Sequence, residues 1–474
     1  MAKAMLLLPP LLFFAVLTFS EGVSFKTVLR LQQFHWEEKW DVSRCLSPKS
    51  RRENGAAILE IKHRDNCQGE PVDWNKKLQE RLSLDDQRVR SFQSRMKNMV
   101  SGNIKAVSNT EIPLTSGVDL GILNYIVSVE LGGQKMTVIV DTGSDLTWVQ
   151  CQPCKMCYNQ RDPLFNPATS SSYQTVLCNS STCQDFQVVM GNRGACGSTP
   201  TCDYVVGYGD GSYTHGELGR GHLNLGSGSQ VGVDNFVFGC GRNDRGLFGG
   251  ASGLMGLGRS SISLVSQTAA LFGGFFSYCL PATDTGASGS LILGRNSSVY
   301  KTSTPITYTR MIPNPQLSTF YFLNLTSITV GGVALQTPSF GNAAMLIDSG
   351  TVITRLPPTI YKAFKAEFLK QFSEYPTAPS FSILDTCFNL STYQEVDIPT
   401  IKLQFEGKAE MTVDVNGILY FVKTDASQVC LALSSLSYED EVGIVGNYQQ
   451  RNQRVIYDTQ KSKLGFAPES CSFT

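Results

Sequence analysis

The fold is decided by the stretch Thr137-Val-Ile-Val-Asp-Thr-Gly-Ser144 and by a close copy of it later in the chain, Met345-Leu-Ile-Asp-Ser-Gly-Thr351. In each copy a run of apolar residues leads into an aspartate, and Thr-Gly or Ser-Gly follows directly. This pattern predicts a buried strand that ends in a sharp turn, which glycine permits. Each copy has a distant apolar partner that contains glycine, at Gly253–Gly256 and at Gly443–Gly446. The duplication predicts two lobes related by a pseudo-twofold axis, with one aspartate from each lobe.

Composition favours a protein built from strands. Of the 474 residues, 42% are hydrophobic and only 17% are charged, so the chain can bury a sizeable core. From residue 112 onward, short alternating runs are separated by glycine pairs such as Gly132-Gly133 and Gly331-Gly332, as in β-hairpins. We therefore predict an all-β fold with a few helices. The clearest helix is expected from Pro358 to Phe372, where phenylalanines recur every four residues.

Charge and the N-terminus narrow the class of protein. Lys and Arg number 40, as do Asp and Glu, and no polybasic stripe is present, so nucleic acid is not an expected partner. Residues 1–22 carry Lys3, an apolar stretch from Met5 to Phe19 and then small polar residues, which is the pattern of a secretory signal peptide. This stretch is short for a membrane anchor, and no apolar tail follows Cys471. A secreted protein without a membrane anchor is expected.

The cysteines and glycosylation sequons agree with a secreted protein. Two of the fourteen cysteines, Cys45 and Cys67, lie early, and the other twelve fall between Cys151 and Cys471, an even number that favours disulfides. The run from Cys151 to Cys157 is also compatible with zinc ligands, but no paired zinc knuckle accompanies it, so no metal is expected. Four sequons fit N-glycosylation, at Asn179, Asn296, Asn324 and Asn389.

The region before residue 112 differs in texture from the rest of the chain. Residues 21–111 contain 17 Lys and Arg against 13 Asp and Glu, whereas residues 112–474 contain 22 against 27. Residues 85–99 have helical composition, with apolar residues at roughly helical spacing. We expect this basic segment to cover an acidic body at neutral pH and to be released as carboxylates are protonated, with cleavage between residues 105 and 122. The alternative is a folded extension or a trafficking element.

The two aspartates form a candidate catalytic pair. If the pseudo-twofold axis brings Asp141 and Asp348 together, like-charge repulsion and burial raise one pKa and leave the other low, so the pair shares a proton. The ionised carboxylate can then take a proton from a water molecule while the protonated one polarises a peptide carbonyl. This chemistry needs no cofactor, and its partners are protein or peptide substrates.

On these motifs the sequence resembles the pepsin family of aspartic endopeptidases, and more closely its plant nepenthesin-like branch. The resemblance covers almost all of residues 120–472 and implies a bilobal, pepsin-like double β-barrel. It makes Asp141 and Asp348 catalytic and Tyr208 the flap tyrosine that closes over substrate, with Gly209 beside it and Trp148 in support. It also implies that the residues around the aspartates support the pair: Thr142, Gly143, Ser144, Ser349, Gly350 and Thr351.

The resemblance further implies a domain division and a disulfide pattern. A signal peptide (1–22), a propeptide (23–115), an N-terminal lobe (116–305) and a C-terminal lobe (306–474) are expected. Residues 151–202 resemble the cysteine-rich insertion of the nepenthesin-like branch, whereas the saposin-like insert of typical plant vacuolar relatives is absent. Spacing alone leaves the pairing open. By resemblance, the expected pairs are Cys151–Cys154, Cys157–Cys240, Cys178–Cys202, Cys183–Cys196, Cys279–Cys471 and Cys387–Cys430.

Other functions fit the same residues less well. Some plant relatives on this fold inhibit glycoside hydrolases and typically have a disturbed catalytic turn, whereas both aspartate turns are intact here. A glycosidase also uses two carboxylates, but it would present them on loops of a sugar-binding cleft. No Gly-x-Ser-x-Gly elbow, His-Glu-x-x-His helix or phosphate-binding loop is present. The prediction is a monomeric, secreted aspartic endopeptidase made as a zymogen, located in the apoplast or alternatively in the vacuole.

Overall fold

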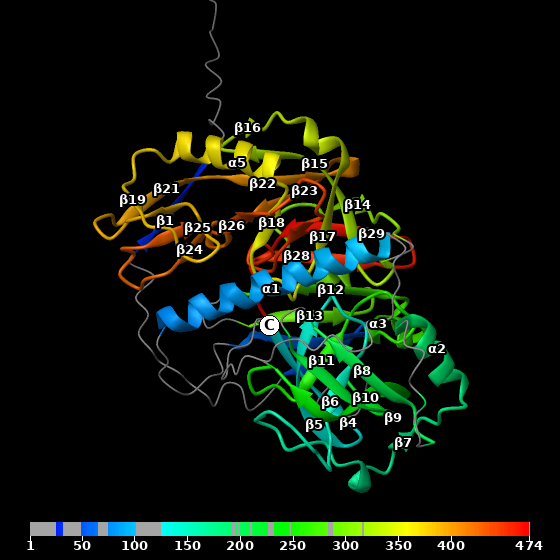
Figure 1. The fold of residues 1–474 in the computed structure, drawn as a ribbon. Coiled ribbons are helices and arrows are strands. Elements are labelled where there is room, and N and C mark those ends of the chain that lie inside the picture. The colour runs from blue at the N-terminus through cyan, green and yellow to red at the C-terminus, as the bar shows by residue number, and fades with distance from the viewer. Residues whose placement is uncertain are drawn as a thin grey trace, which may run out of the picture.

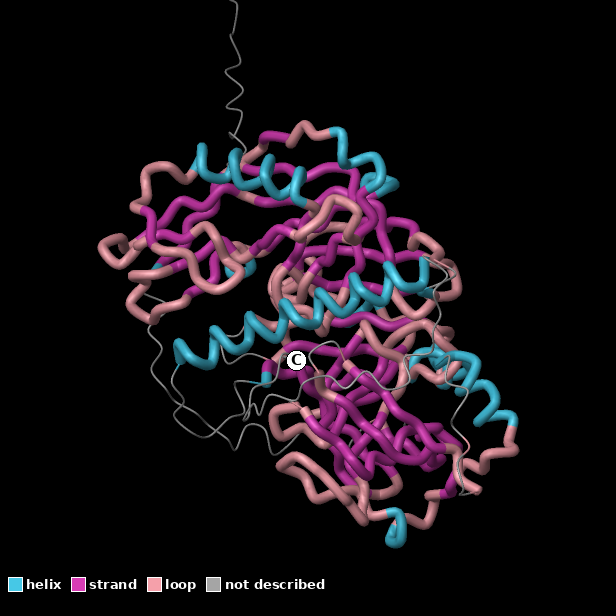
Figure 2. Tube along the Cα trace, in the orientation of Figure 1, coloured by secondary structure: helices cyan, strands magenta, loops and turns pink. Residues whose placement is uncertain are grey.

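Two strand-rich lobes make up the protein, and a long helix, α1 (Trp74–Val100), crosses the face between them in the computed structural model (Figure 1). The structure describes residues 25–31, 49–64, 74–100, 125–190, 196, 200–208, 211–225, 232–246, 248–282, 288–314 and 317–473. The expected signal peptide, Cys45, Cys67, Gly209 and the expected cleavage region at residues 105–122 lie outside these residues. Strands greatly outnumber helices (Figure 2), which confirms the predicted all-β class.

The N-terminal lobe, at the bottom of Figure 1, belongs to a 15-stranded sheet. The main strand order is β14-β29-β28-β12-β13-β3-β4-β5-β11-β6-β10-β9-β7, with β2 paired to β3 and β8 paired to β9. The strands of this lobe are β4 (Tyr125–Leu131), β5 (Gln134–Asp141), β6 (Trp148–Gln150), β7 (Gln174–Thr175), β8 (Asp203–Gly207), β9 (Tyr213–Asn224), β10 (Gly232–Arg245) and β11 (Gly253–Gly256). Its helices are η4 (Pro167–Thr169), α2 (Ser181–Met190), α3 (Leu264–Gln267) and α4 (Ala269–Phe272).

The C-terminal lobe, at the top of Figure 1, contains an 8-stranded and a 4-stranded sheet. The larger sheet has β15 (Phe322–Val330), β16 (Val333–Ala334), β17 (Ala343–Ile347), β18 (Thr354–Leu356), β22 (Ile401–Phe405), β23 (Ala409–Val413), β26 (Leu433–Ser435) and β27 (Gly443–Val445). The smaller has β19 (Thr377–Ala378), β20 (Cys387–Phe388), β24 (Leu419–Phe421) and β25 (Val429–Leu431). The helices are η8 (Pro338–Asn342), α5 (Pro358–Gln371), η9 (Glu406–Lys408) and η10 (Val415–Gly417). Helix α5 confirms the predicted helix, with Phe364 and Phe368 on its buried face.

Part of the expected propeptide is a strand of the core. Strand β3 (Ala56–His63) pairs antiparallel with β13 on one side and with β4 on the other. Ala57, Leu59 and Ile61 on it are fully buried. The other strands of this region are β2 (Ser50–Glu53), β12 (Phe275–Cys279), β13 (Gly289–Leu293), β14 (Thr307–Arg310), β28 (Gln453–Asp458) and β29 (Lys463–Pro468). A short helix, η6 (Ser297–Val299), lies between β13 and β14. In addition, β1 (Lys26–Arg30) pairs with β21 (Glu395–Pro399) of the C-terminal lobe.

The predicted duplication is present in the strand pairing. Strand β5 pairs in parallel with β11, and β17 pairs in parallel with β27, so each aspartate strand lies beside its expected glycine-containing partner. The next neighbours repeat the pattern, because β6 is antiparallel to β11 and parallel to β10, while β18 is antiparallel to β27 and parallel to β26. The predicted hairpin glycines are also confirmed, with φ of 55° at Gly132 and 51° at Gly331. The two lobes therefore share one local architecture around their aspartates.

Four of the six expected disulfide pairings are wrong. The structure confirms Cys279–Cys471 and Cys387–Cys430, but it forms Cys151–Cys240, Cys154–Cys157, Cys178–Cys196 and Cys183–Cys202. The pairing of β6 with β10 places Cys151 beside Cys240, so these two cysteines bond to each other. Cys154 bonds instead to Cys157, three residues along the chain. Burial explains the pairing of the remaining four cysteines. Cys183 and Cys202 are fully buried in one hydrophobic cluster, whereas Cys178 is partly buried and Cys196 is exposed.

The four sequons differ in exposure. Asn179 and Asn389 are exposed and Asn324 is partly buried. Asn296 is buried, and its Nδ2 donates to the carbonyl oxygen of Glu53 at 3.1 Å. This fold therefore does not present the Asn296 amide for a glycan. In the part of the chain that the structure describes, no helix combines the length and apolar character needed to cross a membrane.

Candidate active site

The structure brings the two predicted aspartates together. Asp141 is the last residue of β5, and Asp348 follows β17 directly. Both side chains are fully buried, at 0% exposure. The apolar strands explain this placement, because β-branched and aliphatic residues in the two core strands carry the chain inward up to the turn. The predicted pair thus lies where the turns of the two lobes meet.

The two turns are bonded to each other across the lobes. The Thr142 amide donates to Ser349 Oγ at 3.0 Å, and the Ser349 amide donates to Thr142 Oγ1 at 2.9 Å. Ser349 Oγ in turn donates to the carbonyl oxygen of Val140 at 3.3 Å. These reciprocal bonds satisfy buried polar groups of both turns at once and fix the spacing of the aspartates.

Glycine is required at both turns because each turn touches the carboxylate of the opposite lobe. A Cβ atom added at Gly143 would lie 2.7 Å from Asp348 Oδ1, and one added at Gly350 would lie 2.6 Å from Asp141 Oδ1. Both distances are shorter than any ordinary carbon–oxygen contact. Each glycine amide also donates to the aspartate two residues earlier, at 3.0 Å in both lobes. The predicted roles of Gly143 and Gly350 are therefore positional.

The hydroxyl support of the two carboxylates is unequal. Thr351 Oγ1 donates to Asp348 Oδ2 at 2.6 Å. Its counterpart, Ser144 Oγ, is buried and makes no comparably short hydrogen bond among the described residues, although it lies near enough to Asp141 to lower the pKa of that carboxyl. Burial raises the pKa of Asp141, Arg88 opposes this shift, and the neighbouring Asp348 adds to it. The net effect of these contacts is a pKa above the ordinary value for a buried carboxyl that the Arg88 guanidinium contacts.

A residue that the sequence motifs did not point to contacts both aspartates. Arg88, in the middle of α1, donates from Nη2 to Asp141 Oδ1 at 2.9 Å and to Asp348 Oδ1 at 3.1 Å, and from Nε to Asp348 Oδ2 at 3.0 Å. The Arg88 side chain is only 5% exposed. One guanidinium therefore bridges both carboxylates, and a planar fork of this kind suits paired carboxylate oxygens.

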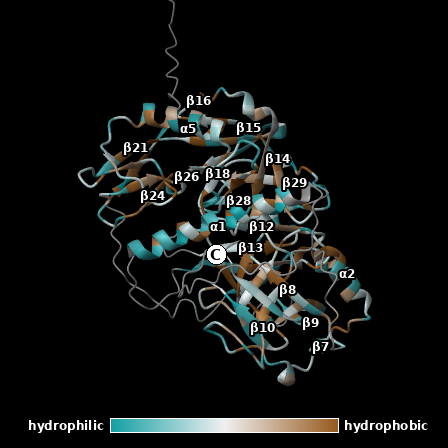
Figure 3. Cartoon of the chain, in the orientation of Figure 1, coloured by the Kyte–Doolittle hydropathy of each residue, from teal (hydrophilic) through white to brown (hydrophobic). Residues whose placement is uncertain are grey.

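The remainder of α1 is anchored on the C-terminal lobe. Leu78 and Leu82 join one cluster of buried residues of that lobe, and Val89, Phe92 and Met96 join another. Burying each such side chain contributes about 1.5–3 kcal/mol, whereas an exposed ion pair such as Lys97–Asp440 contributes about 0–1 kcal/mol. Figure 3 shows hydrophilic residues along α1 where it crosses the lobes. Apolar burial thus holds the helix, and Arg88 fixes its position over the aspartates.

Tyr208 and Trp148, which the resemblance assigns to a flap, lie together on the N-terminal lobe. Strands β8 and β9 pair antiparallel. Tyr208 follows β8, and its amide donates to the carbonyl oxygen of Ser212 at 2.8 Å. Trp148 is fully buried, and its Nε1 donates to Tyr208 Oη at 2.7 Å. This bond places Trp148 in direct support of Tyr208, as the resemblance implies.

Several supporting residues carry no signal that sequence reasoning used. Asn447 Nδ2 donates to the carbonyl oxygen of Ser349 at 2.8 Å, and Gln450 Nε2 donates to that of Asp348 at 3.2 Å. Both follow the Gly443–Gly446 element, so the repeat points to the right segment but not to these amides. Arg88 carries no motif at all. A basic residue within the expected helical segment was the one available clue.

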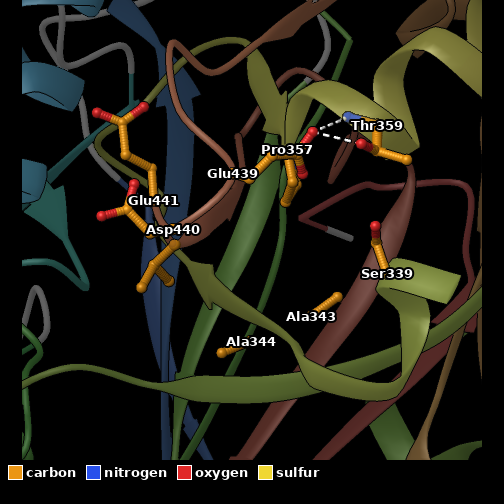
Figure 4. Close-up of a pocket in the computed structure, with 9 residues that line it drawn as sticks. Ser339, Ala343, Ala344, Pro357, Thr359, Glu439, Asp440 and Glu441 are labelled. Carbon is orange, nitrogen blue, oxygen red and sulfur yellow. Dashed lines mark hydrogen bonds between the residues drawn. The ribbon is translucent and has the colours of Figure 1, made fainter.

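A second concave region lies away from the aspartates. A cavity of about 430 Å³ opens between α5, β17 and the loop after β26 (Figure 4), lined by Ser339, Ala343, Ala344, Pro357, Thr359, Glu439, Asp440, Glu441 and Val442. Its acidic side chains are used structurally. Glu439 accepts bonds from the amide and hydroxyl of Thr359, and Glu441 accepts from the amides of Ser437 and Tyr438. This cavity holds no mirrored carboxylate pair.

Comparison with known proteins identifies the class. Two family models match, described as xylanase inhibitor N-terminal over residues 125–295 and xylanase inhibitor C-terminal over residues 320–468. The chain is 43% identical over 397 residues to an aspartyl protease family protein of Arabidopsis thaliana, with 82% of each chain covered. It is 34% identical over 385 residues to aspartic proteinase nepenthesin-1 of Nepenthes gracilis, covering 78% of this chain and 83% of that protein.

Solved structures support the same fold. The crystal structure titled edgp superposes with a TM-score of 0.59 at 21% identity, over 75% of this chain and 93% of that one. The basic 7S globulin of soybean superposes with a TM-score of 0.57 at 21% identity, over 74% and 92%. Two lobes with one buried aspartate each define the class of pepsin-like proteins. Within that class, the chain belongs to the plant pepsin-like aspartic protease family, as its motifs predicted.

Proposed function

We propose that this chain is a secreted aspartic endopeptidase made as a latent precursor, with Asp141 and Asp348 as its catalytic residues. The observation that carries the proposal is the complete dyad. Two buried carboxylates from mirrored turns are bonded to the same guanidinium, and their turns are tied together by Thr142 and Ser349. A protein that had lost catalysis would have no need to keep both carboxylates buried at such cost.

In the open form, the dyad has what peptide hydrolysis requires. With Arg88 withdrawn, a water molecule between the carboxylates gives a proton to the ionised one while the protonated one polarises the scissile carbonyl. Burial raises the pKa of Asp141, which suits it to hold the shared proton. The amides of Gly143 and Gly350 and the hydroxyl of Thr351 keep the carboxylates in position. Tyr208, held by Trp148, closes over the bound peptide.

Latency follows from the position of α1. Arg88 neutralises the dyad and fills the place where a water molecule and a peptide would bind. Because apolar burial contributes most to the binding of α1, lowered pH is expected to weaken this contact without expelling the helix by itself. Cleavage within residues 105–122 would also leave β3 in the core, held by strand pairing on both sides. Activation therefore requires local unfolding of the N-terminal segment as well as neutralisation of charge.

An inhibitor or binding protein on the same fold is the second candidate. It is favoured by the descriptions of the matching family models, which name xylanase inhibitors. The experiment that separates the two is hydrolysis of a denatured protein across acid pH, with and without pepstatin, after acid treatment of the full chain. Pepstatin-sensitive hydrolysis supports the endopeptidase. Stable protein that shows no hydrolysis at any pH would refute it.

A further inference from the structure

A carboxylate-binding site lies in the C-terminal lobe beside the dyad, and Asp85 of α1 occupies it. Asp85 is fully buried. Its Oδ1 accepts from the Val352 amide at 2.6 Å, and its Oδ2 accepts from the Ile353 amide at 3.2 Å and from Arg355 Nη2 at 2.9 Å. Two consecutive backbone amides and one guanidinium thus converge on a single carboxylate. That arrangement is typical of a site built for an anion.

The site belongs to the body of the protein and is fixed independently of α1. Val352 and Ile353 follow the turn of Asp348, and Arg355 lies in β18, inside the 8-stranded sheet. Arg355 is 1% exposed, and its Nη1 also donates to the carbonyl oxygen of Ile353 at 3.1 Å, which orients the guanidinium. Among the described residues, the carboxylate that forms an ion pair with Arg355 is that of Asp85.

Departure of α1 leaves these donors without their acceptor. Water can then bond these donors, but it does not offer the charge of the carboxylate that they held. A carboxylate replaces Asp85 better than a neutral group can, because the arginine fork matches two carboxylate oxygens. Since Asp85 precedes Arg88 by one helical turn, the site lies close to the place where the scissile bond would bind.

We infer that Arg355, with the amides of Val352 and Ile353, forms a substrate subsite that selects an acidic side chain. The inference rests on the proposed endopeptidase function and adds to it a specificity. Val352 lies four residues beyond Asp348, so the subsite is near the dyad but separate from it. Because a bound peptide in extended conformation advances about 3.3 Å per residue, the acidic side chain is expected a few residues from the scissile bond. In the latent chain Asp85 occupies this subsite as a substrate side chain would.

The test compares paired peptides that differ only in one Glu or Gln. A single Glu is moved through the four positions on each side of the scissile bond, and kcat/KM is measured with the acid-activated full chain at pH 5.5, where free Glu is ionised. At one position, Glu is expected to be preferred over Gln by about tenfold or more. The preference is expected to shrink at pH 3.5, where Glu is largely protonated. Equal kcat/KM for Glu and Gln at every position would overturn the inference and leave the proposed function intact.

Variants of Arg355 connect the preference to this site. Arg355→Met is expected to abolish the preference, and Arg355→Lys, which keeps the charge without the fork, should retain part of it. Arg310→Met is the matched control, because Arg310 is exposed and pairs with Glu406. A full Glu preference in folded Arg355→Met or Arg355→Lys protein would overturn the inference.

Binding gives a measurement that does not depend on catalysis. Versions of both peptides with a reduced scissile amide are labelled, and fluorescence anisotropy measures their binding to the same acid-treated protein. Tighter binding of the Glu peptide that is lost in Arg355→Met supports the subsite, even where hydrolysis is absent and the proposed function has failed. Equal binding of the two peptides would overturn the subsite.

Discussion

The two lobes carry the same aspartate turn, but the contacts that hold the turn differ between them. Each turn offers one buried aspartate, one glycine amide that bonds it and one hydroxyl that bonds the opposite turn. The C-terminal turn has in addition the Thr351 hydroxyl on Asp348 and two of the three Arg88 bonds. The buried apolar side chains of α1 also pack on the C-terminal lobe. The two turns are therefore symmetric in their own bonds, whereas the contacts from Thr351, Arg88 and α1 fall mainly on the C-terminal lobe.

The largest expected effect tests the symmetric part of this comparison. Asp141→Asn and Asp348→Asn should each lower kcat by at least about a thousandfold, because both proton-transfer roles are needed. Circular dichroism should show an unchanged fold, since Asn keeps the shape of Asp. If one variant kept substantial activity after contaminating proteases were excluded, the two aspartates would not act as a pair.

Arg88 tests the bridge between the lobes. Removing one partner of a buried ion pair costs about 3–5 kcal/mol, so Arg88→Gln should loosen α1 and increase the rate of processing at pH 5 by about tenfold or more. N-terminal sequencing and activity toward a short peptide measure this. Arg90→Gln is the control, because Arg90 lies on the same helix, is 77% exposed and pairs with Asp86. Equal processing of Arg88→Gln and wild type would show that Arg88 does not maintain latency.

Sequence reasoning reached the fold and the dyad because both depend on local, repeated patterns. The apolar run before each aspartate determines a core strand, and the glycine after it determines a turn, so Asp141 and Asp348 could be predicted without coordinates. The disulfides of the cysteine-rich stretch could not, because their pairing depends on strand register and burial. Cys151 meets Cys240 only through the β6–β10 ladder.

Arg88 and Arg355 escaped prediction for a related reason. Their function lies in a contact between segments more than 250 residues apart, and neither belongs to a local motif. The place of strand β3 in the core was also not predicted. The basic composition of the N-terminal segment suggested a separable cover, yet Leu59 and Ile61 are part of the main hydrophobic core.

A smaller effect is expected from the unequal hydroxyls. Thr351→Val removes a short hydrogen bond to the buried Asp348 carboxyl, which costs about 1–3 kcal/mol, and should lower kcat/KM by about tenfold or more. Ser144→Ala should change it less than about threefold, because Ser144 Oγ makes no comparably short hydrogen bond and acts on Asp141 only by lowering the pKa of its carboxyl. Steady-state kinetics on the acid-activated protein decide between them. Equal losses would mean that Ser144 bonds Asp141 once Arg88 has left, and that the asymmetry belongs to the latent state alone.

The smallest effect concerns the pH dependence of the latent chain, and its sign follows from Asp85. In the closed chain, burial beneath α1 raises the pKa of Asp85, while Arg355 and the amides of Val352 and Ile353 oppose the shift. This burial is absent once α1 has left, so the raised pKa belongs to Asp85 in the closed chain and not to a substrate carboxylate in the open subsite. A carboxyl whose pKa is higher in the folded than in the unfolded chain contributes stability that is fully present below the unfolded value of about 3.9 and is lost as the pH rises through the folded value. Asp85, like Asp141, therefore does not make the closed chain acid-labile above about pH 4.

Asp85 and Asp141 therefore do not drive the release of α1, which is expected only below about pH 4, where ordinary carboxylates become protonated. Thermal midpoints of wild type and Asp85→Asn, measured from pH 6.5 to pH 4, check the sign. The wild type should gain stability relative to the variant as the pH falls, because only the wild type takes up a proton at this position. Asp86→Asn, one residue along and partly exposed beside Arg90, serves as the control and should show little change in this difference. A wild type that loses stability relative to Asp85→Asn on acidification would show that Arg355 lowers the Asp85 pKa. The buried Asp85–Arg355 ion pair would then be the acid trigger, and α1 would be released at a higher pH.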